Sequence, residues 1–317
     1  MDPVVVVGAG IGGVSCARAL CAAGLGVHLI DRGRRVGGRM AVYTRDDRPT
    51  DIGASYFTVS DPRFAEIVAG WQRRGLAHAW TDTFEVFEDG SRRSQSGPLR
   101  WAAARGLGSL VEDLAEGLAV ERARVDAVQP GPRVDGLAAS AVVLAMPDPQ
   151  AARLLHPELA AVASVLDNRF EPVIALAAGW SRRSWSEQFQ AAFVNNERHL
   201  SWIADDGRRR GDGGPVLVAH STADTAAGHL ADPDAVREPM VAALRGLLDI
   251  AEPPAWTHLH SWTYAKPVAG RDARYLLDDS LVGVCGDSWS DRPRVEAAYL
   301  SGLALAEALV RRLGRQR

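Results

Sequence analysis

The sequence of 317 residues contains little lysine and little cysteine, and both shortages limit what it can do. Of its 36 Lys and Arg residues only Lys266 is a lysine. A GC-rich genome explains this bias, so the arginine count by itself does not indicate phosphate binding. The cysteines, Cys16, Cys21 and Cys285, form no Cys-x-x-Cys pair, which argues against a dithiol–disulfide reductase and against a zinc site. Cys16 and Cys21 lie among alanines, where we expect them to pack.

The sequence also lacks a strong charge of either sign and a long apolar run. Its net charge of −3 and pI near 6.3 give no reason to expect nucleic acid or an anionic membrane as a partner. The apolar stretch from Val4 to Ala17 is shorter than the ~18 residues needed to span a bilayer, and no basic residue precedes it as in a signal peptide. We therefore expect a cytoplasmic protein without a membrane partner.

Glycines near the start of the sequence form its most informative motif. The valine run Val4–Val7 leads into Gly8-Ala9-Gly10-Ile11-Gly12-Gly13 and a small-residue segment that ends near Gly24. A second apolar run, Val27–Ile30, ends in Asp31. The order of strand, glycine turn, helix, strand and acid predicts a nucleotide-binding βαβ unit. A glycine-rich turn in another α/β protein is the alternative, and it would not require the flanking strands and the acid.

Each part of this unit has a physical role. Gly8 permits a tight turn, Gly10 lets the backbone approach a pyrophosphate, and Gly13 lets the helix pack closely on the strand. The N–H groups at the helix start attract phosphates. Asp31 stands where a carboxylate accepts hydrogen bonds from ribose hydroxyls.

A strand followed by a glycine and a helix is also predicted near the other end of the sequence. The run Leu281–Cys285 ends in Gly286-Asp287, and a helix is expected over Arg294–Leu313 after Pro293. A glycine turn alone would suit NAD. Two such devices at opposite ends of the chain indicate a longer cofactor with a ribityl chain and a flavin ring.

The segments between these ends predict a second domain. We expect a helix beginning at Asp61-Pro62, a hairpin at 84–91, a solvated charged loop at 205–211 and a strand with an aromatic face at 255–264. Together with the family resemblance described below, these segments lead us to expect an α/β fold class, with a Rossmann-type FAD-binding domain built from both chain ends and a mixed-sheet α+β substrate domain. We assign residues 1–60, 100–165 and 266–317 to the first domain, and 61–99 and 166–265 to the second.

Several motifs together resemble the FAD-dependent amine-oxidase superfamily. They are Gly8–Gly13, Asp31, Gly37-Gly38-Arg39, Ala145-Met146-Pro147, Gly286-Asp287 and Val295–Gly302. Three further segments most resemble its renalase-like branch: Asp51–Thr58, Asp61–Phe64 and Trp262–Ala265. The resemblance covers nearly the whole chain and is most specific at the two ends.

The resemblance implies non-covalently bound FAD. The residues it places at the cofactor are Gly8, Gly10, Ile11, Gly12, Gly13, Asp31, Arg32, Gly38, Arg39, Met40, Gly53, Ala54, Ser55, Val125, Pro147, Gly286, Asp287 and Val295.

Some of these residues have specific roles in the resemblance. Arg39 would neutralise the diphosphate, and Val125, in a strand after Ala123-Arg124, would pair with adenine through its backbone. The segment 53–56 would line the isoalloxazine ring, and Asp287 would bind the ribityl or diphosphate region. The N–H of Val295 would stabilise negative charge on the reduced flavin.

The substrate pocket is expected to contain Tyr56, Trp202, Trp262, Tyr264 and Arg294, although core packing explains any single aromatic residue equally well. The lysine that amine oxidases of this superfamily carry near flavin N5 would fall near Ala175. Arg294 would disfavour a cationic amine and favour an anionic or carbonyl-rich substrate. The alternative is that Arg294 is a solvated residue at a helix start.

The sequence departs from the renalase-like pattern at Ser55, where glutamine is expected, and at Ser261 and Thr263, where arginines are expected. These losses weaken the case for a phosphate-bearing substrate such as a misreduced NAD(P). His260 is a candidate catalytic base, but a hydride donor needs none, and a histidine packed in an aromatic face is the alternative. No metal is expected.

The sequence thus predicts an FAD-dependent oxidoreductase that takes a hydride from a small-molecule substrate to flavin N5 and is reoxidised by O2, giving H2O2. The alternatives are an amine oxidase or desaturase of specialised metabolism, an NAD(P)-dependent dehydrogenase, and a non-catalytic flavin-binding protein. The oligomeric state stays open.

Overall fold

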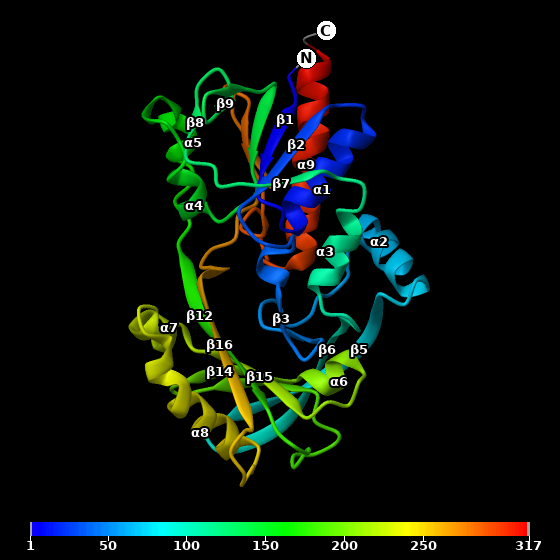
Figure 1. Ribbon diagram of the computed structural model, residues 1–317, viewed down its shortest axis with the longest axis vertical. Helices are drawn as coiled ribbons and strands as arrows, with labels where there is room; N and C mark the ends of the chain where they lie inside the picture. Colours follow the sequence, from blue (N-terminus) through cyan, green and yellow to red (C-terminus); the bar gives the residue numbers. More distant parts are fainter. Residues whose placement is uncertain (1, 316–317) are drawn as a thin grey trace. The chain divides into compact units, whose positions relative to one another are not determined.

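The computed structural model of the protein describes residues 2–315 and divides into two compact units (Figure 1). The first unit comprises Met1–Met40, Val111–Phe170 and Pro267–Arg317, and the second comprises Ala41–Leu110 and Glu171–Lys266. Both ends of the chain belong to the first unit, as the sequence predicted. Residues 41–60, 100–110 and 266, which we expected in the cofactor domain, cluster with the second unit instead, and residues 166–170, expected in the substrate domain, cluster with the first.

The first unit is built on a sheet with the strand order β17-β18-β11-β1-β2-β7, in which all neighbouring pairs are parallel except β17 with β18. These strands are β1 (Val4–Val7), β2 (Val27–Asp31), β7 (Val120–Arg122), β11 (Ala141–Leu144), β17 (Leu276–Leu277) and β18 (Val282–Val284). The strand formed by the first valine run lies between β2 and β11, so the glycine turn that follows it lies at the centre of the sheet's carboxyl edge. A ligand site at this edge is typical of doubly wound sheets.

Helices and a small sheet cover this parallel sheet. Helix α1 (Ile11–Ala22) packs along α9 (Val295–Gly314), as Figure 1 also shows. Alternate strand residues form a hydrophobic core with β8 (Val128–Gln129), β9 (Arg133–Val134), α4 (Asp148–Ala152), η2 (Pro157–Leu159) and α5 (Ala160–Ala163). Strand β10 (Leu137–Ala138) pairs with β9 and is exposed. The unit therefore has the layered α/β architecture of a Rossmann-type domain.

The second unit contains a larger, mixed sheet with the strand order β16-β12-β15-β14-β13-β5-β6. Its strands are β5 (Ala77–Glu88), β6 (Ser91–Ala103), β12 (Phe170–Gly179), β13 (Ala191–Asn195), β14 (Leu200–Asp205), β15 (Val216–Ser221) and β16 (Trp256–Pro267). The pair β13 and β5 is parallel, whereas β12 with β15 and β14 with β15 are antiparallel. The mixed sheet expected for the substrate domain is thus present.

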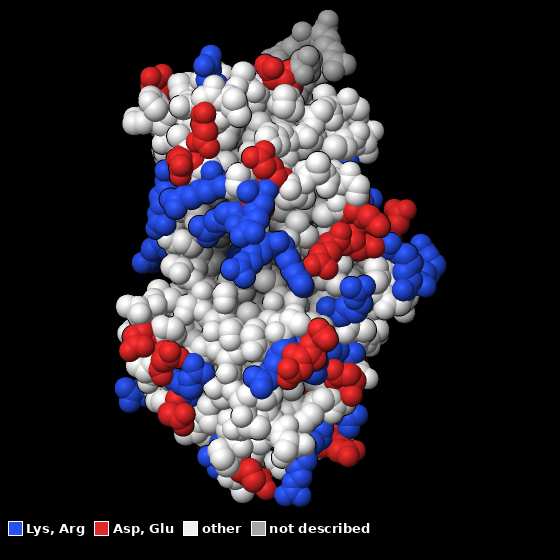
Figure 2. Space-filling model, viewed as in Figure 1, with Lys and Arg blue, Asp and Glu red and all other residues white. Residues whose placement is uncertain are grey.

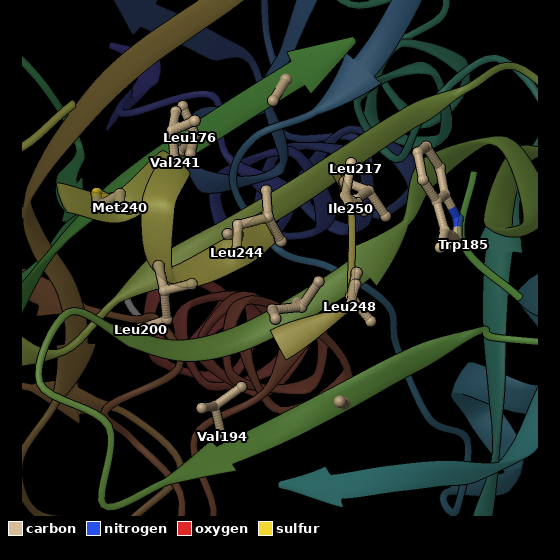
Figure 3. Close-up of a cluster of buried hydrophobic side chains, with 14 of the residues drawn as sticks. Leu176, Trp185, Val194, Leu200, Leu217, Met240, Val241, Leu244, Leu248 and Ile250 are labelled. Atoms are coloured by element: carbon tan, nitrogen blue, oxygen red, sulfur yellow. The ribbon is translucent and has the colours of Figure 1, made fainter. Parts of the chain in front are cut away.

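One face of the mixed sheet carries the main core of the second unit. Helices α7 (Ala223–His229), η3 (Pro233–Val236) and α8 (Arg237–Leu247) follow β15 in the chain, and the apolar side of α8 packs on this face. Figure 3 shows Met240, Val241 and Leu244 of α8 directed toward strand residues such as Leu176 and Leu217. These side chains are fully or almost fully buried. Their burial is the main source of stability for the unit.

The remaining elements are η1 (Gly38–Met40) in the first unit, α3 (Gly108–Leu114) across the boundary, and β3 (Val42–Arg45), β4 (Arg48–Asp51), α2 (Pro62–Arg73) and α6 (Asp206–Arg210) in the second. Helix α2 begins as predicted, because Asp61 Oδ1 accepts a hydrogen bond of 2.9 Å from the N–H of Arg63. The predicted hairpin forms from β5 and β6, and the predicted aromatic strand is β16.

Three local predictions are wrong. Residues 205–211 form no solvated loop, since most of α6 is buried. Val125 lies outside the strands, because β7 ends at Arg122. Cys16 is buried as expected, but Cys21 is exposed and has no packing role.

Acidic and basic side chains are intermingled over much of the face shown in Figure 2, with one area where basic side chains gather. This pattern agrees with the small net charge of −3. None of the helices formed by residues 2–315 has the length and apolar composition of a membrane span.

Candidate functional site

The glycines of the first turn differ in what a side chain would meet. Gly8 has a φ of +107°, and a Cβ there would lie 2.5 Å from the carbonyl oxygen of Ala145. A Cβ on Gly13 would lie 1.9 Å from the carbonyl oxygen of Gly8. At Gly10, by contrast, a Cβ would meet no atom of the described residues within 4 Å. Packing therefore explains glycine at positions 8 and 13, while the open space above Gly10 is where a ligand could approach the backbone.

Asp31, at the end of β2, is held against this turn. Its Oδ2 accepts a hydrogen bond of 2.6 Å from the N–H of Ala9, and its Oδ1 accepts one of 2.6 Å from the N–H of Gly33. An ionised carboxylate has about four acceptor positions, so lone pairs remain for ribose hydroxyls. The structure thus fixes the orientation of the acid that the sequence assigned to the ribose.

Arg39 and Asp287, which come from opposite ends of the chain, form a two-pronged ion pair. Their hydrogen bonds measure 3.0 Å from Nη1 to Oδ2 and 2.5 Å from Nη2 to Oδ1. Gly37 anchors the segment before Arg39 to the glycine turn, because its N–H donates to the carbonyl oxygen of Ala9 at 2.9 Å. The sequence assigned both ends of the chain to one cofactor, and the structure brings their polar groups together in one unit.

The close contact of α1 with α9 aligns the two ends. A Cβ on Gly302 of α9 would lie 1.9 Å from the carbonyl oxygen of Gly12, so only glycine fits there. Ser15 Oγ donates to the carbonyl oxygen of Tyr299 at 2.8 Å, and the N–H of Gly286 donates to Ser301 Oγ at 3.0 Å. These contacts fix the strand-to-helix connection after β18 relative to the glycine turn.

Arg294 precedes Val295, the first residue of α9, and its charge is matched locally. Its Nη2 lies 3.0 Å from Oε2 of Glu296, whose side chain is fully buried, while 39% of the Arg294 side chain is exposed. The sequence argument treated Arg294 as an uncompensated cation that selects an anionic substrate. Because Glu296 offsets this cation, Arg294 no longer supports that argument.

The other cofactor contacts expected in the first unit are dispersed around the turn and sheet. Ile11 and Met40 are buried, Gly38 begins η1, Pro147 precedes α4, Arg32 is exposed, and Val125 is buried in a segment without regular structure.

The segment that would line the isoalloxazine, Gly53, Ala54 and Ser55, belongs to the second unit. Arg209 of α6 binds the backbone of this segment and of Asp51, two residues before it. Its Nη1 donates to the carbonyl oxygen of Ser55 at 2.9 Å, and its Nη2 donates to the carbonyl oxygen of Asp51 at 3.2 Å. Sequence reasoning missed this support because Arg209 lies in the stretch that was interpreted as a solvated loop.

Arg209 is part of a buried ionic cluster that also contains Asp51, Asp206 and Arg210. Asp206 Oδ1 accepts hydrogen bonds from Arg209 Nη2 at 2.5 Å and from Arg210 Nη2 at 3.2 Å. Burial raises the pKa of Asp206, but nearby guanidinium groups outweigh burial and hold the pKa below its usual value. Burial dominates at Asp51 and raises its pKa. Two aspartates followed by three arginines, at residues 205–210, are the sequence signal that could have identified this cluster.

The expected aromatic residues separate into two groups of the second unit. Tyr56 and Trp202 have ring centroids 5.7 Å apart, and Phe84 contacts both. Trp262 belongs to another cluster, where its Nε1 donates to the carbonyl oxygen of Ile52 at 2.8 Å. Tyr264, on the same strand as Trp262, is half-buried.

The candidate base His260 packs edge-on against Trp262, with ring centroids 4.3 Å apart. Burial and the neighbouring His258 lower the pKa of His260. This geometry agrees with the interpretation of His260 as a histidine packed in an aromatic face. A role of His260 as a catalytic base stays a prediction.

The polar groups and the open space at the glycine turn of the first unit fit an adenine dinucleotide. It offers space above Gly10, a carboxylate acceptor at Asp31 and an arginine at the glycine turn. Each oxygen of the Asp287 carboxylate accepts one hydrogen bond from that arginine and keeps a further acceptor position. Fold and site together define the class as an oxidoreductase that uses a dinucleotide cofactor.

Comparisons with known families agree with this class and refine it. A family model described as "NAD(P)-binding Rossmann-like domain" matches residues 6–71, and one described as "Flavin containing amine oxidoreductase" matches residues 67–310. The second match covers more than half of the chain, so the chain belongs to the flavin-containing amine oxidoreductase family. The protein is therefore a flavin-dependent oxidoreductase, and FAD is its cofactor.

Solved structures with a similar fold include two amine oxidases. Putrescine oxidase bound to putrescine is 17% identical, with a TM-score of 0.73 over 98% of this chain and 99% of the other. Cyclohexylamine oxidase from Brevibacterium oxydans is 14% identical, with a TM-score of 0.76 over 99% of both chains. At these identities the likeness shows the fold alone.

Curated relatives match only a short stretch. The 4,4'-diapolycopene oxygenase of a Methylomonas species is 43% identical over 56 residues, which are 18% of this chain and 11% of that protein. The hydroxyneurosporene desaturase of Rubrivivax gelatinosus is 46% identical over 56 residues, again 18% and 11%. The chain thus matches about a tenth of the length of these relatives.

Proposed function

We propose that the protein is an FAD-dependent oxidase of the renalase-like type, which takes a hydride from a small organic molecule and passes the electrons to O2. The observation that carries this proposal is the ion pair between Arg39 and Asp287 beside the open glycine turn. NAD has no ribityl group, so an enzyme that binds only NAD needs no second set of polar contacts from the C-terminal part of the polypeptide. The segments around Tyr56 and Trp262 support the renalase-like type.

The residues of the first unit would act by binding and orientation. Asp31 would hold the adenosine ribose, and the backbone at Gly10 with the start of α1 would hold the diphosphate. Arg39 would offset diphosphate charge, and Asp287 would accept hydrogen bonds from ribityl hydroxyls. The N–H of Val295 at the start of α9 would favour negative charge on the ring edge.

Bound FAD would supply a hydride acceptor at N5, so few catalytic side chains are needed. Overall, the substrate would lose a hydride and a proton, and O2 would gain two electrons and two protons to give H2O2. In the second unit, Ser55 and its neighbours would lie along the ring, held through the carbonyl contacts of Arg209. His260 would serve as a base only for a substrate that must lose a proton before the hydride leaves.

The test is the absorption spectrum of the purified protein, followed by anaerobic mixing with donors. We expect flavin bands, bleaching by a small organic hydride donor, and H2O2 formation when air is admitted. Dihydronicotinamide isomers and aliphatic amines form the first panel. A colourless protein that stays colourless with added FAD would contradict cofactor binding. A yellow protein that no donor bleaches would favour a non-catalytic flavin-binding protein.

Simple amine oxidation and desaturation are the rival reactions. Ala175 stands where a lysine near N5 is expected in amine oxidases, which argues against the first. Desaturation remains a rival reaction, because short stretches of the chain match the hydroxyneurosporene desaturase and the 4,4'-diapolycopene oxygenase. The donor panel decides between the two. Bleaching by amines faster than by dihydronicotinamide isomers would replace the renalase-like assignment with amine oxidation.

A further inference from the structure

His220 lies on the face of the mixed sheet opposite to the one that α8 covers. Side chains alternate along β15, where Leu217 and Ala219 belong to the core under α8. Val218 belongs instead to the cluster on the opposite face, so His220, two residues further on, shares that face. In the sheet register, His220 lies beside Ala175 of β12 and Trp202 of β14.

Four buried nitrogen atoms in this region lack a hydrogen-bond partner among residues 2–315: His220 Nε2, Trp202 Nε1, Arg209 Nε and the Nε of Arg100, whose guanidinium lies over the Phe84 ring. Arg209 Nε still faces a carboxylate, because Asp51 Oδ2 lies 4.0 Å away. Buried polar atoms are nearly always paired, so orphans in one region call for a ligand or ordered water. They are connected through contacts: His220 pairs in register with Trp202, Trp202 contacts Tyr56, and Arg209 holds the carbonyl of Ser55 next to Tyr56.

The chemistry of these atoms indicates what such a ligand offers. The indole and guanidinium nitrogens are donors only, and a neutral imidazole donates from one of its two nitrogens. Burial, together with the charges of Lys266 and Arg209, lowers the pKa of His220 to about 3, so the ring is neutral near pH 7. A region of unpaired donors suits a ligand that accepts hydrogen bonds and is unfavourable for an ammonium group, which can only donate them.

We propose that His220 and Trp202, with Arg209 behind them, form a substrate subsite for a carbonyl or carboxylate group, so that this enzyme acts on acceptor-rich neutral or anionic molecules and not on alkylammonium ions. This inference rests on the proposed function, because it assigns the second unit to substrate binding. It replaces the argument from Arg294, whose charge Glu296 offsets. His220 is a specificity-determining residue here, and no proton transfer is assigned to it.

The test compares three probes of similar size on the holoenzyme: benzoate, benzamide and benzylamine. Binding is followed by the shift of the flavin band and by the part of the tryptophan fluorescence change that Trp202→Phe removes, because the chain has nine tryptophans. We expect benzoate and benzamide to bind at least about tenfold more tightly than benzylamine, as hydrogen bonds to buried donors allow. Thermal unfolding is measured for every variant.

Three variants separate specificity from stability. His220→Leu is expected to reduce the preference for benzamide over benzylamine about five- to tenfold, and His220→Asn, which keeps a donor, to restore most of it. His258→Leu is the matched control, because His258 lies on β16 of the same sheet and its ring stacks on Tyr43 at 3.8 Å. If His220→Leu does not fold, Trp202→Phe removes a donor while keeping an aromatic ring and is expected to lower the same preference.

Two results would overturn the subsite. One is equal or tighter binding of benzylamine by the wild type; the other is an equal change of preference in His220→Leu and His258→Leu. Failure of the proposed function looks different, since the wild type would then show no flavin band or a flavin band that no donor bleaches. Tryptophan fluorescence would still read the probe preference in that case.

Discussion

At the scale of single residues, Gly10 and Gly13 lie in the same turn but are glycines for different reasons. Gly10 has a φ of −73° and ψ of 175°, a conformation open to any residue, and its side-chain direction is empty among the described residues. Gly13 touches the backbone of Gly8 and leaves no room for a Cβ. One glycine serves a ligand and the other serves packing.

This difference predicts opposite effects of the same substitution. Gly10→Val is expected to leave the free energy of unfolding within ~0.5 kcal/mol of wild type but to weaken FAD binding at least about tenfold, because the side chain fills the space for the diphosphate. Gly13→Val is expected to destabilise the fold by at least ~1–3 kcal/mol through overpacking. Urea unfolding without added FAD and flavin titration measure the two quantities. Unchanged flavin affinity in Gly10→Val would contradict the diphosphate assignment.

The roles of these glycines could be predicted from the sequence because each depends on neighbours in the same short motif. The pairing of Arg294 with Glu296 was equally local but was missed, since a charge two residues away on a helix start was not weighed against the cation. The orphan nitrogen of His220 could not be predicted at all. It depends on strand register between β12, β15 and β14.

At the scale of elements, α6 shows how a charged segment becomes a core element. Asp206, Arg209 and Arg210 are buried together, and their charges match those of Asp51. Arg209 reaches the carbonyl oxygen of Ser55, whereas Arg210 reaches those of Ala103 and Ala104. A run of arginines usually indicates a solvated surface. The partners that reverse this expectation lie far away in the sequence.

The two arginines provide a matched pair of variants. Arg209→Leu and Arg210→Leu are each expected to lower the free energy of unfolding by ~3–5 kcal/mol, because each leaves buried carboxylates unmatched. Arg209→Leu is expected to change the visible spectrum of bound flavin more than Arg210→Leu, because Arg209 holds the backbone carbonyls of Asp51 and Ser55, whereas Arg210 contacts the Asp51 carboxylate. Urea unfolding and absorption spectra check this. Equal spectral changes in both variants would contradict a specific role of Arg209 in positioning Ser55.

At the scale of the whole molecule, the neutral state of His220 should be visible in acid stability. Burial and the charges of Lys266 and Arg209 lower its pKa from 6.5 to about 3 in the folded state. The unfolded chain therefore binds a proton that the folded chain refuses, so stability falls as the pH drops from about 6.5 toward 3. The expected result is a lower Tm on acidification and a shallower slope in His220→Leu. Parallel slopes in wild type and variant would contradict the assignment.

The sequence predicted the architecture of the first unit well, since glycine turns, strands and a helix dipole are local features. The division of the chain was harder to predict. Residues 41–60 carry a motif that resembles a flavin contact, and this favoured the cofactor domain. In the structure they pack with the second unit through Asp51, Arg48 and α6, because the buried cluster requires a carboxylate from β4.

The contact of α1 with α9 has a consequence for biosynthesis. The carbonyl of Gly12 and the hydroxyl of Ser15 contact a helix that is translated much later, since Ser15 and Tyr299 lie 284 residues apart in the chain. At ribosomal rates of ~5–20 residues per second, this delay is on the order of tens of seconds. During that time the nascent first unit exposes the side of α1 that α9 will cover. Flavin loading should therefore follow the synthesis of α9, and until then chaperones could bind the exposed side of α1.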